Sequence, residues 1–190
     1  MRRPTNISFD GRPIEIVVDS AYLVLLDPLV LDGLRANLKS LAGLRPAERA
    51  GKLRILPGPL RIGVHEIKGF RPGIYRLAAS DLEAYDEDNV SDDGVCDVDS
   101  GAIIIADIGK LDALAKILTW ERYDYLLRSP LEDDSRYLAL IDELGGPFFG
   151  LLNPADSTVF NGDGSYKLRE GSPITAERPT PTIEVQGCAN

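Results

Sequence analysis

The sequence predicts an α+β fold, in one domain with a mainly antiparallel sheet and an internal repeat. Short apolar, β-branched segments alternate with turn-forming residues, which is typical of strands joined by tight connections. Leucines at helical spacing follow two of these strand pairs. The same order of strand, bend, strand and helix occurs twice along the chain. One such unit cannot cover its own apolar face, so we predict that the two units pack together into one pseudo-symmetric domain.

The repeat is strongest between residues 18–34 and 98–114, which align without gaps at an offset of 80. Each copy places an Asp-Ser pair between two strands and a second aspartate before the helix. We predict that the first aspartate closes an Asx-type turn and that the second caps the helix. The repeat units extend over about residues 12–43 and 92–118. Seven aligned positions are identical: Val18/Val98, Asp19/Asp99, Ser20/Ser100, Asp27/Asp107, Leu31/Leu111, Asp32/Asp112 and Leu34/Leu114.

The first unit is expected to form two strands within residues 14–26 and a helix that begins at Pro28 and stops at Gly43. Residues 44–59 contain several prolines and glycines and are predicted to be a connector. Two further strands follow, each bounded by turn residues. They are expected within residues 61–68 and 70–77.

The second unit is expected to form strands within residues 95–107 and a helix over residues 110–118. Residues 129–132, Ser-Pro-Leu-Glu, predict the start of another helix, because serine, proline and glutamate occupy the N-cap, first and third positions. Residues 148–152 are predicted to be a buried strand. Residues 158–168 are predicted to form a hairpin, because the sequence NGDG supplies residues that tolerate positive φ.

Length and composition restrict the class of protein. The chain has 190 residues, of which 44% are hydrophobic, and this suits one globular domain with a substantial core. No apolar run reaches the ~18 residues of a membrane span, and no apolar segment follows the first arginines as in a signal peptide. We therefore expect a cytoplasmic protein that does not bind membranes. Residues 1–170 are assigned to the domain and residues 171–190 to a flexible C-terminal tail.

Cysteine and histidine are scarce. Cys96 and Cys188 are too few for a disulfide scaffold, and His65 is the only histidine. This scarcity disfavours histidine-based zinc sites, Ser-His-Asp triads and Cys-His dyads. His65 lies in an alternating strand pattern, where a packed or surface histidine is favoured over a general base. We expect no metal site, no cofactor and no catalytic set.

Negative charge is concentrated in one part of the chain. The formal net charge is −9, and no lysine or arginine occurs between Arg76 and Lys110. That segment holds ten carboxylates, so the rest of the chain is close to neutral at −9 + 10 = +1. Nucleic-acid binding requires a basic footprint, which this distribution lacks. A basic protein partner fits it better.

Residues 79–94 are predicted to form an exposed acidic loop. Our first hypothesis is a non-enzymatic protein-binding module, in its most specific form an immunity-type protein that neutralises a basic bacterial toxin. Calcium binding is an alternative use of such an oxygen-rich loop, although the spacing does not follow the EF-hand pattern. We assign partner binding to five carboxylates of the loop: Asp86, Glu87, Asp88, Asp92 and Asp93.

Two alternative hypotheses remain. One is a housekeeping structural domain whose partner is unrelated to the acidic loop, and the other is an Asp-based hydrolase or a metal-dependent enzyme. Asp19 and Asp99 would act as acid and base if the pseudo-symmetry brought the two bends together. The sequence DVDSG, which begins at Asp97, resembles the nucleophile motif of haloacid-dehalogenase-like phosphatases, where the first aspartate attacks phosphate. The other repeat unit has Val17 at that position. Both bends are also explained by turn capping alone.

Four short motifs occur in the order VDSAYLVLLDP, FRPGIYRL, VDSGAIIIAD and NGDGSYKL. In this order they resemble a bacterial family, domain of unknown function 4241. The resemblance spans roughly residues 12–170, and the sequence departs from the family pattern at Ala21, where glycine is expected. The resemblance implies a fold and a bacterial source, and it carries no established activity.

Overall fold

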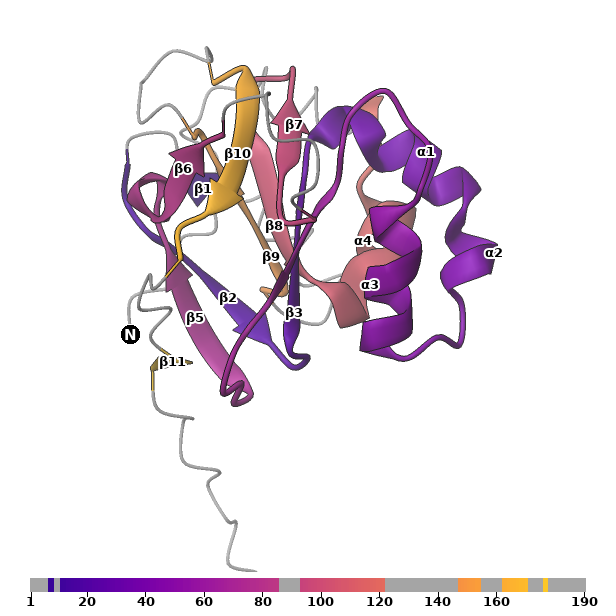
Figure 1. The fold of residues 1–190 in the computed structure, drawn as a ribbon, viewed down its shortest axis with the longest axis horizontal. Coiled ribbons are helices and arrows are strands. Elements are labelled where there is room, and N and C mark those ends of the chain that lie inside the picture. Colours follow the sequence, from indigo (N-terminus) through magenta and orange to yellow (C-terminus); the bar gives the residue numbers. More distant parts are fainter. Residues whose placement is uncertain are drawn as a thin grey trace, which may run out of the picture.

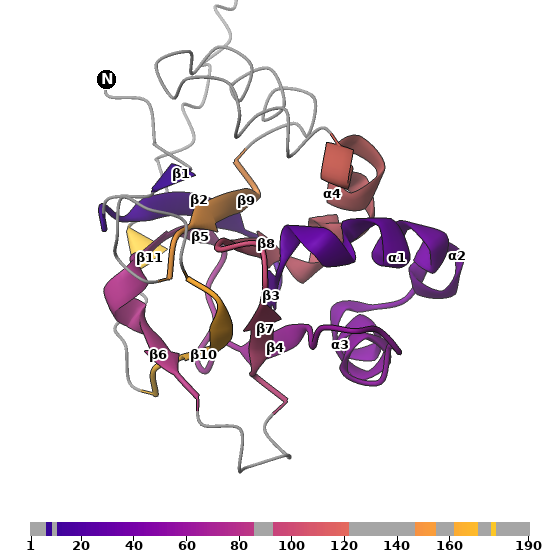
Figure 2. The same cartoon turned by 90° about the horizontal axis from the view of Figure 1, so that it is seen from above.

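A computed structural model describes residues 7–8, 11–85, 93–121, 147–154, 162–170 and 176–177. These residues form helices and mainly antiparallel strands, which confirms the predicted α+β class. The elements are arranged in layers, with helices on one side of a central five-stranded sheet and two three-stranded sheets on the other side (Figures 1 and 2).

The central sheet has the strand order β1-β9-β8-β3-β4. The pair β1–β9 is parallel and the other three pairs are antiparallel. Strand β8 is buried along its whole length, as expected for a strand covered on both faces. The five strands are β1 (Ile7–Ser8), β3 (Tyr22–Leu26), β4 (Gly63–Glu66), β8 (Ile103–Asp107) and β9 (Phe149–Leu152).

Helices follow β3 and β8 directly, as the leucine spacing predicts. Each begins with a 3-10 turn whose N-cap is the aspartate at the end of the preceding strand. The predicted first helix is divided at Asn37, so that two shorter helices replace it. The helical elements are η1 (Pro28–Val30), α1 (Leu31–Ala36), α2 (Leu38–Leu41), α3 (Pro46–Arg54), η3 (Ile108–Lys110) and α4 (Leu111–Ile117).

The helices cover one face of the central sheet with an apolar core. Alternating residues of the strands point to this face, because successive side chains of a strand project to opposite sides. Val24 of β3 and Ile104 of β8 belong to this cluster, together with Leu31, Leu34 and Leu111 of the helices. Burial of this apolar area is the main stabilising contribution to the helical layer.

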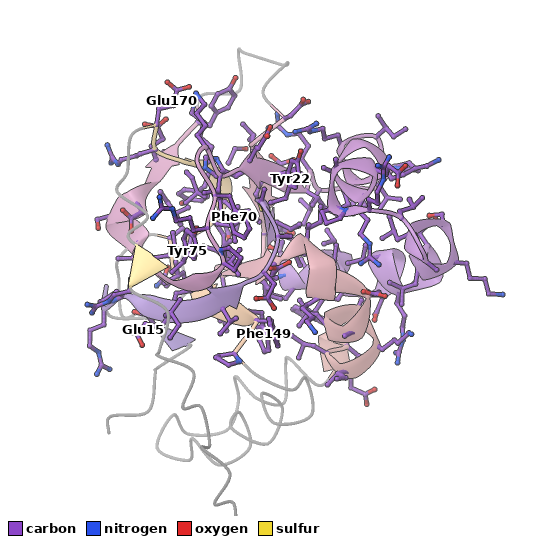
Figure 3. All side chains as sticks on the ribbon, turned by 90° about the horizontal axis from the view of Figure 1, so that it is seen from below. Glu15, Tyr22, Phe70, Tyr75, Phe149 and Glu170 are labelled. Atoms are coloured by element: carbon purple, nitrogen blue, oxygen red, sulfur yellow. The ribbon has the colours of Figure 1, made fainter. Side chains whose placement is uncertain are left out.

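Two small sheets cover the opposite face. Leu23, Leu25 and Ile105 of the central sheet form a second core with these sheets. Phe70 and Tyr75 stack at its edge with ring centroids 6.3 Å apart (Figure 3). The sheets have the orders β11-β5-β2 and β6-β10-β7. Their strands are β2 (Ile14–Val18), β5 (Gly73–Leu77), β6 (Leu82–Ala84), β7 (Cys96–Val98), β10 (Gly164–Leu168) and β11 (Ala176–Glu177), and η2 (Ala79–Asp81) precedes β6.

The prediction of a connector over residues 44–59 was wrong in its first part. Residues Pro46–Arg54 form α3. Pro46 occupies the first helical turn, where its missing N–H costs nothing, and the Glu48 side chain accepts a hydrogen bond from the Arg45 backbone N–H at 2.8 Å. Arg49 attaches α3 to η3 and α4, because its guanidinium donates to the Ile108 carbonyl and pairs with Asp112 at 2.9 Å. The proline and glycine content of this segment favoured the prediction of a connector, although Pro46 and Glu48 occupy the positions typical of a helix start.

The C-terminal predictions had mixed outcomes. Within residues 171–190, which we predicted to be a flexible tail, Ala176–Glu177 form β11 and pair with β5, whose edge offers backbone hydrogen bonds. Strand β10, which forms the second half of the predicted hairpin, pairs with β6 and β7, and residues 158–161 lie outside the described residues. The helix predicted to start at residues 129–132 lies outside the described residues.

Candidate functional site

The Asp-Ser bend of the first repeat unit is held by an aspartate of the second. The backbone N–H groups of Asp19 and Ser20 both donate to Oδ2 of Asp107, the latter at 2.9 Å. The Ser20 hydroxyl donates to Oδ1 of the same carboxylate at 2.8 Å, and the N–H of Gly109 donates to Oδ1 at 2.6 Å. Asp107 is 1% exposed. A buried carboxylate requires this degree of hydrogen bonding to offset its lost hydration.

The bend of the second unit is held in the same way by the first. The backbone N–H groups of Asp99 and Ser100 donate to Oδ2 of Asp27 at 2.7 and 2.8 Å. Oδ1 of Asp27 accepts the N–H of Leu29 at 2.7 Å and so caps η1. Asp27 is completely buried. Each strand-end aspartate therefore caps its own helical turn and the bend of the other unit.

One half of the capping prediction is confirmed and the other half is wrong. Asp27 and Asp107 cap the helical turns that follow them, as predicted. The bends were predicted to be closed by the side chains of Asp19 and Asp99 as Asx-type turns. Their backbone N–H groups are bound instead by the distant aspartates, and both bend aspartates are exposed. These contacts join residues 72 to 88 positions apart, and such long-range contacts have no local sequence signal.

Asp19 and Asp99 do not form an acid–base pair. Strands β3 and β8 run antiparallel with Leu23 opposite Asp107 and Leu26 opposite Ile104. The two bends therefore lie at opposite ends of this strand pair, separated by about four residues or roughly 13 Å along the strands. Two groups this far apart cannot share a proton, so the hypothesis that the pseudo-symmetry brings the bends together is wrong.

Asp97 lies in a polar cluster with Arg61 and Ser165. Its carboxylate accepts hydrogen bonds from the backbone N–H of Arg61 at 2.8 Å, from the Arg61 guanidinium through Nε and Nη2, and from the Ser165 hydroxyl at 2.8 Å. Burial alone would raise the pKa of Asp97, but the hydrogen bonds from Arg61 and Ser165 outweigh it and lower the pKa. The cluster joins β7, β10 and the segment before β4.

This geometry argues against a nucleophilic role for Asp97. Both of its oxygens already accept hydrogen bonds, and a lowered pKa makes its carboxylate a weaker base and nucleophile. The same lowered pKa makes Asp97 a poor base for activating the Ser165 hydroxyl. The hydrogen bonds of Asp97 join three segments of the fold as a polar clamp, and the likeness of DVDSG to a phosphatase motif stays a prediction.

Half of the carboxylates between Arg76 and Lys110 already bind other residues of the protein. Of the ten carboxylates between Arg76 and Lys110, five are engaged within the fold, and Asp99 is exposed beside its bend. The other four, which include Asp86 and Asp92, lie outside the described residues. The five engaged carboxylates are Asp81 on the Ala78 N–H, Glu83 with Lys167, Asp93 with Arg54, Asp97 with Arg61, and Asp107 in the core.

Asp93 is the one proposed partner-binding residue that the structure describes. Its side chain is 65% exposed and lies 3.4 Å from Nε of Arg54. Its backbone carbonyl accepts the N–H of Val64 at 2.9 Å, which fixes this end of the acidic segment to β4. Asp86, Glu87, Asp88 and Asp92 lie outside the described residues, and their placement stays a prediction.

His65 and Cys96 have environments that favour their neutral forms. His65 lies on β4, and burial, with Lys68 nearby, lowers the pKa of its imidazole. Cys96 is a buried free thiol, and burial together with the charges of Asp27 and Asp97 raises its pKa. A protonated, buried thiol is unreactive. Neither residue is placed as a nucleophile or a general base by these surroundings.

Within the described residues, no group of three or more histidine, cysteine, aspartate or glutamate side chains is arranged to hold a metal ion. None of the helices found in that part of the chain combines the length and the apolar character that crossing a membrane requires.

The chain matches no known family model, no curated protein and no solved structure. The resemblance to the domain of unknown function 4241 family therefore stays a prediction.

Proposed function

We propose that the chain is a non-enzymatic protein-binding module that captures a basic protein through its acidic segment. In the specific form of this proposal, it is an immunity-type protein of the bacterial cytoplasm that neutralises a basic toxin. The proposed contact residues are the carboxylates of the acidic segment: Asp86, Glu87, Asp88, Asp92 and Asp93.

The observation that carries the proposal is the way in which the acidic segment is anchored. At one end, the N–H of Tyr85 donates to the Ser165 carbonyl at 2.8 Å, and at the other end Asp93 is bonded to Val64. Between these anchors, residues 86–92 hold four carboxylates and no basic side chain. A carboxylate cluster presented from a fixed base attracts a basic surface at long range and raises its association rate.

The chemistry of the rest of the described chain supports binding over catalysis. Asp27, Asp107 and Asp97 are committed to structural hydrogen bonds, and the exposed pair Asp19 and Asp99 is separated by the β3–β8 register. A dense run of carboxylates lies in residues 86–92.

The test compares two variants of equal charge. The first carries Asp86→Asn, Asp88→Asn, Asp92→Asn and Asp93→Asn. The control neutralises four exposed carboxylates elsewhere, and both variants have a formal charge of −9 + 4 = −5. The control substitutions are Glu66→Gln, Glu121→Gln, Asp163→Asn and Glu170→Gln.

Each protein is used to capture partners from the native bacterial lysate at low and high salt, and the affinity of any captured protein is then measured by calorimetry. We expect one basic partner to bind the wild type and the control, and to bind the acidic-segment variant at least tenfold more weakly. Binding should weaken at high salt, because salt screens exposed charges. Equal binding by both variants, or binding insensitive to salt, would contradict the proposal.

A further inference from the structure

We infer that the domain consists of two interlocked copies of one unit, related by a two-fold axis, in which each copy lends its last strand to a sheet of the other. The β3–β8 pair lies at the centre of the molecule. The sequence repeat has an offset of 80, so Leu25 and Ile105 are counterparts. In the β3–β8 pair, Leu25 lies directly opposite Ile105. A two-fold axis requires this self-pairing, and it passes between these two residues.

The next strands outward obey the same axis. Strand β4 pairs with β3, and β9 pairs with β8, so the four strands have the symmetric order β9-β8-β3-β4. Val24 lies opposite Val64, and its counterpart Ile104 lies opposite Leu151. The register thereby makes β4 and β9 counterparts, with Gly63 and Val64 corresponding to Gly150 and Leu151.

The small sheets provide an independent check, because their alignment comes from register and not from sequence. Val18 of β2 lies opposite Gly73, and its counterpart Val98 of β7 lies opposite Gly164. This aligns β5 with β10 residue for residue. The two strand sequences are GIYRL and GSYKL, which share glycine, tyrosine and leucine and exchange one basic residue for another. Counterparts found from hydrogen bonding thus have similar sequences.

The last strand of each copy is exchanged. Strand β6 follows β5 along the chain but pairs with β10, while β11 follows β10 but pairs with β5. Tyr166 lies opposite Ala84, and its counterpart Tyr75 lies opposite Ala176. The side chains show the same exchange, because Asp27 of the first copy binds the bend of the second copy and Asp107 of the second copy binds the bend of the first. Each copy is therefore completed by the other, and the two unfold together.

The copies differ where the polar clamp lies. Asp97 and Ser165 of the second copy stand where the first copy has Val17 and Ile74, so only the second copy has the carboxylate and hydroxyl that bind Arg61. In both copies, however, the backbone N–H of the residue at this position donates to a carbonyl of the other copy. The N–H of Val17 donates to the Pro147 carbonyl, and the N–H of Asp97 donates to the Arg61 carbonyl.

The first test is a crystal structure of the full chain. Residues 14–84 are superposed on residues 94–177 with the counterparts given by the strand registers. We expect a two-fold rotation that brings counterpart Cα atoms of the five strand pairs within one residue spacing, ~3.8 Å. A rotation that is not two-fold, or a fit that requires a different register, would overturn the inference.

The second test measures the exchange directly, by amide hydrogen exchange of the full chain by NMR. In Asp27→Asn, exchange at the amides of residues 99 and 100 should accelerate roughly tenfold more than exchange at the amides of residues 19 and 20. Asp107→Asn should give the reverse pattern. Acceleration confined to the bend of the substituted copy would overturn the interlock. If a variant does not fold, the crystal structure decides.

Discussion

At the scale of single residues, the fold depends on two buried carboxylates that never meet solvent. Asp27 accepts three backbone hydrogen bonds, and Asp107 accepts three from the backbone and one from the Ser20 hydroxyl. Ionised groups are rarely buried unless they are paired or fully hydrogen-bonded. Backbone N–H groups at two bends and two helical turns provide that bonding here. The bends and helix starts are consequently fixed relative to one another by two side chains.

Neutralising either carboxylate should destabilise the protein. Asp27→Asn and Asp107→Asn place an amide N–H₂ against backbone donors, so we expect each to cost roughly 2–3 kcal/mol of unfolding free energy. Asp107→Asn should cost more, because Asp107 also loses the Ser20 hydroxyl. Chemical denaturation in urea measures both values. The exposed Asp19→Asn and Asp99→Asn serve as controls, with changes within about 0.5 kcal/mol. Equal effects in all four variants would show that the crossed hydrogen bonds contribute little.

The Asp97 clamp should make stability depend on pH. The pKa of Asp97 is lower in the folded protein than in the unfolded chain, so its contribution is present above the unfolded value, ~3.9, and is lost as the pH falls through the folded value. We expect wild type to lose more stability than Asp97→Asn between neutral pH and about pH 3. Thermal melts of both proteins over this range provide the measurement. A difference in melting temperature that stays constant with pH would exclude this contribution.

At the scale of elements, the sequence predicted strands and bends better than helices. The bends at Ser20 and Ser100 are bounded by apolar runs, two of them rich in β-branched residues, and the length and pattern of these runs are local signals. Helix α3 has a weak local signal, because its apolar face is narrow and glycine lies within it. Its position depends on Arg49, whose partners Ile108 and Asp112 are far away in the sequence. Tertiary contacts of this kind override local propensity.

Glycine at position 63 is required by the close approach of two chain segments. A Cβ there would lie 2.5 Å from the Gly94 carbonyl oxygen and 3.2 Å from the Cys96 backbone nitrogen. We expect Gly63→Ala to destabilise the protein by about 1–3 kcal/mol, because backbone atoms must move. Gly51→Ala in α3 is the matched control, since its Cβ meets nothing within 4 Å. That change should stabilise by ~0.5–1 kcal/mol. Urea denaturation of both variants measures the two effects, and a neutral Gly63→Ala would mean that the segments can separate at little cost.

At the scale of the whole molecule, the two cores share one sheet. Leu25 and Ile105 point to one face of the sheet and Val24 and Ile104 to the other, so both cores depend on β3 and β8. Loss of either core would expose the apolar side chains on one face of β3 and β8 to water. We therefore expect the described layers to unfold in one cooperative transition.

Two residues can report on the two layers separately. Trp120 packs against the core on the helical side, and Cys96 is buried in the core on the other side. In a Cys188→Ser background, Trp120 fluorescence and the reactivity of the Cys96 thiol should change at the same urea concentration. Earlier exposure of either probe would show that one layer opens on its own and would contradict a single transition.

The candidate binding residues came from the sequence alone, because charge density is a property of composition. The sequence could not predict which of these carboxylates bind other residues within the fold. Asp97 and Asp107 belong to the same acidic segment as Asp93, yet one clamps Arg61 and the other lies in the core. Arg61 lies 36 positions from Asp97, and the bend that Asp107 holds lies 87 and 88 positions from it along the chain. Only the folded arrangement separates structural carboxylates from those that remain for a partner.

The backbone contacts around β4 have a consequence for solubility. A sheet whose outermost strand presents unpaired N–H and C=O groups can recruit a strand from another chain and so begin aggregation. On the outer side of β4, Val64 donates to the Asp93 carbonyl, and Arg61, just before the strand, accepts from Asp97. At the opposite border, β1 offers only the two residues Ile7 and Ser8. The most apolar strands of the protein are thus kept away from intermolecular pairing by a covering segment on one side and a short border on the other.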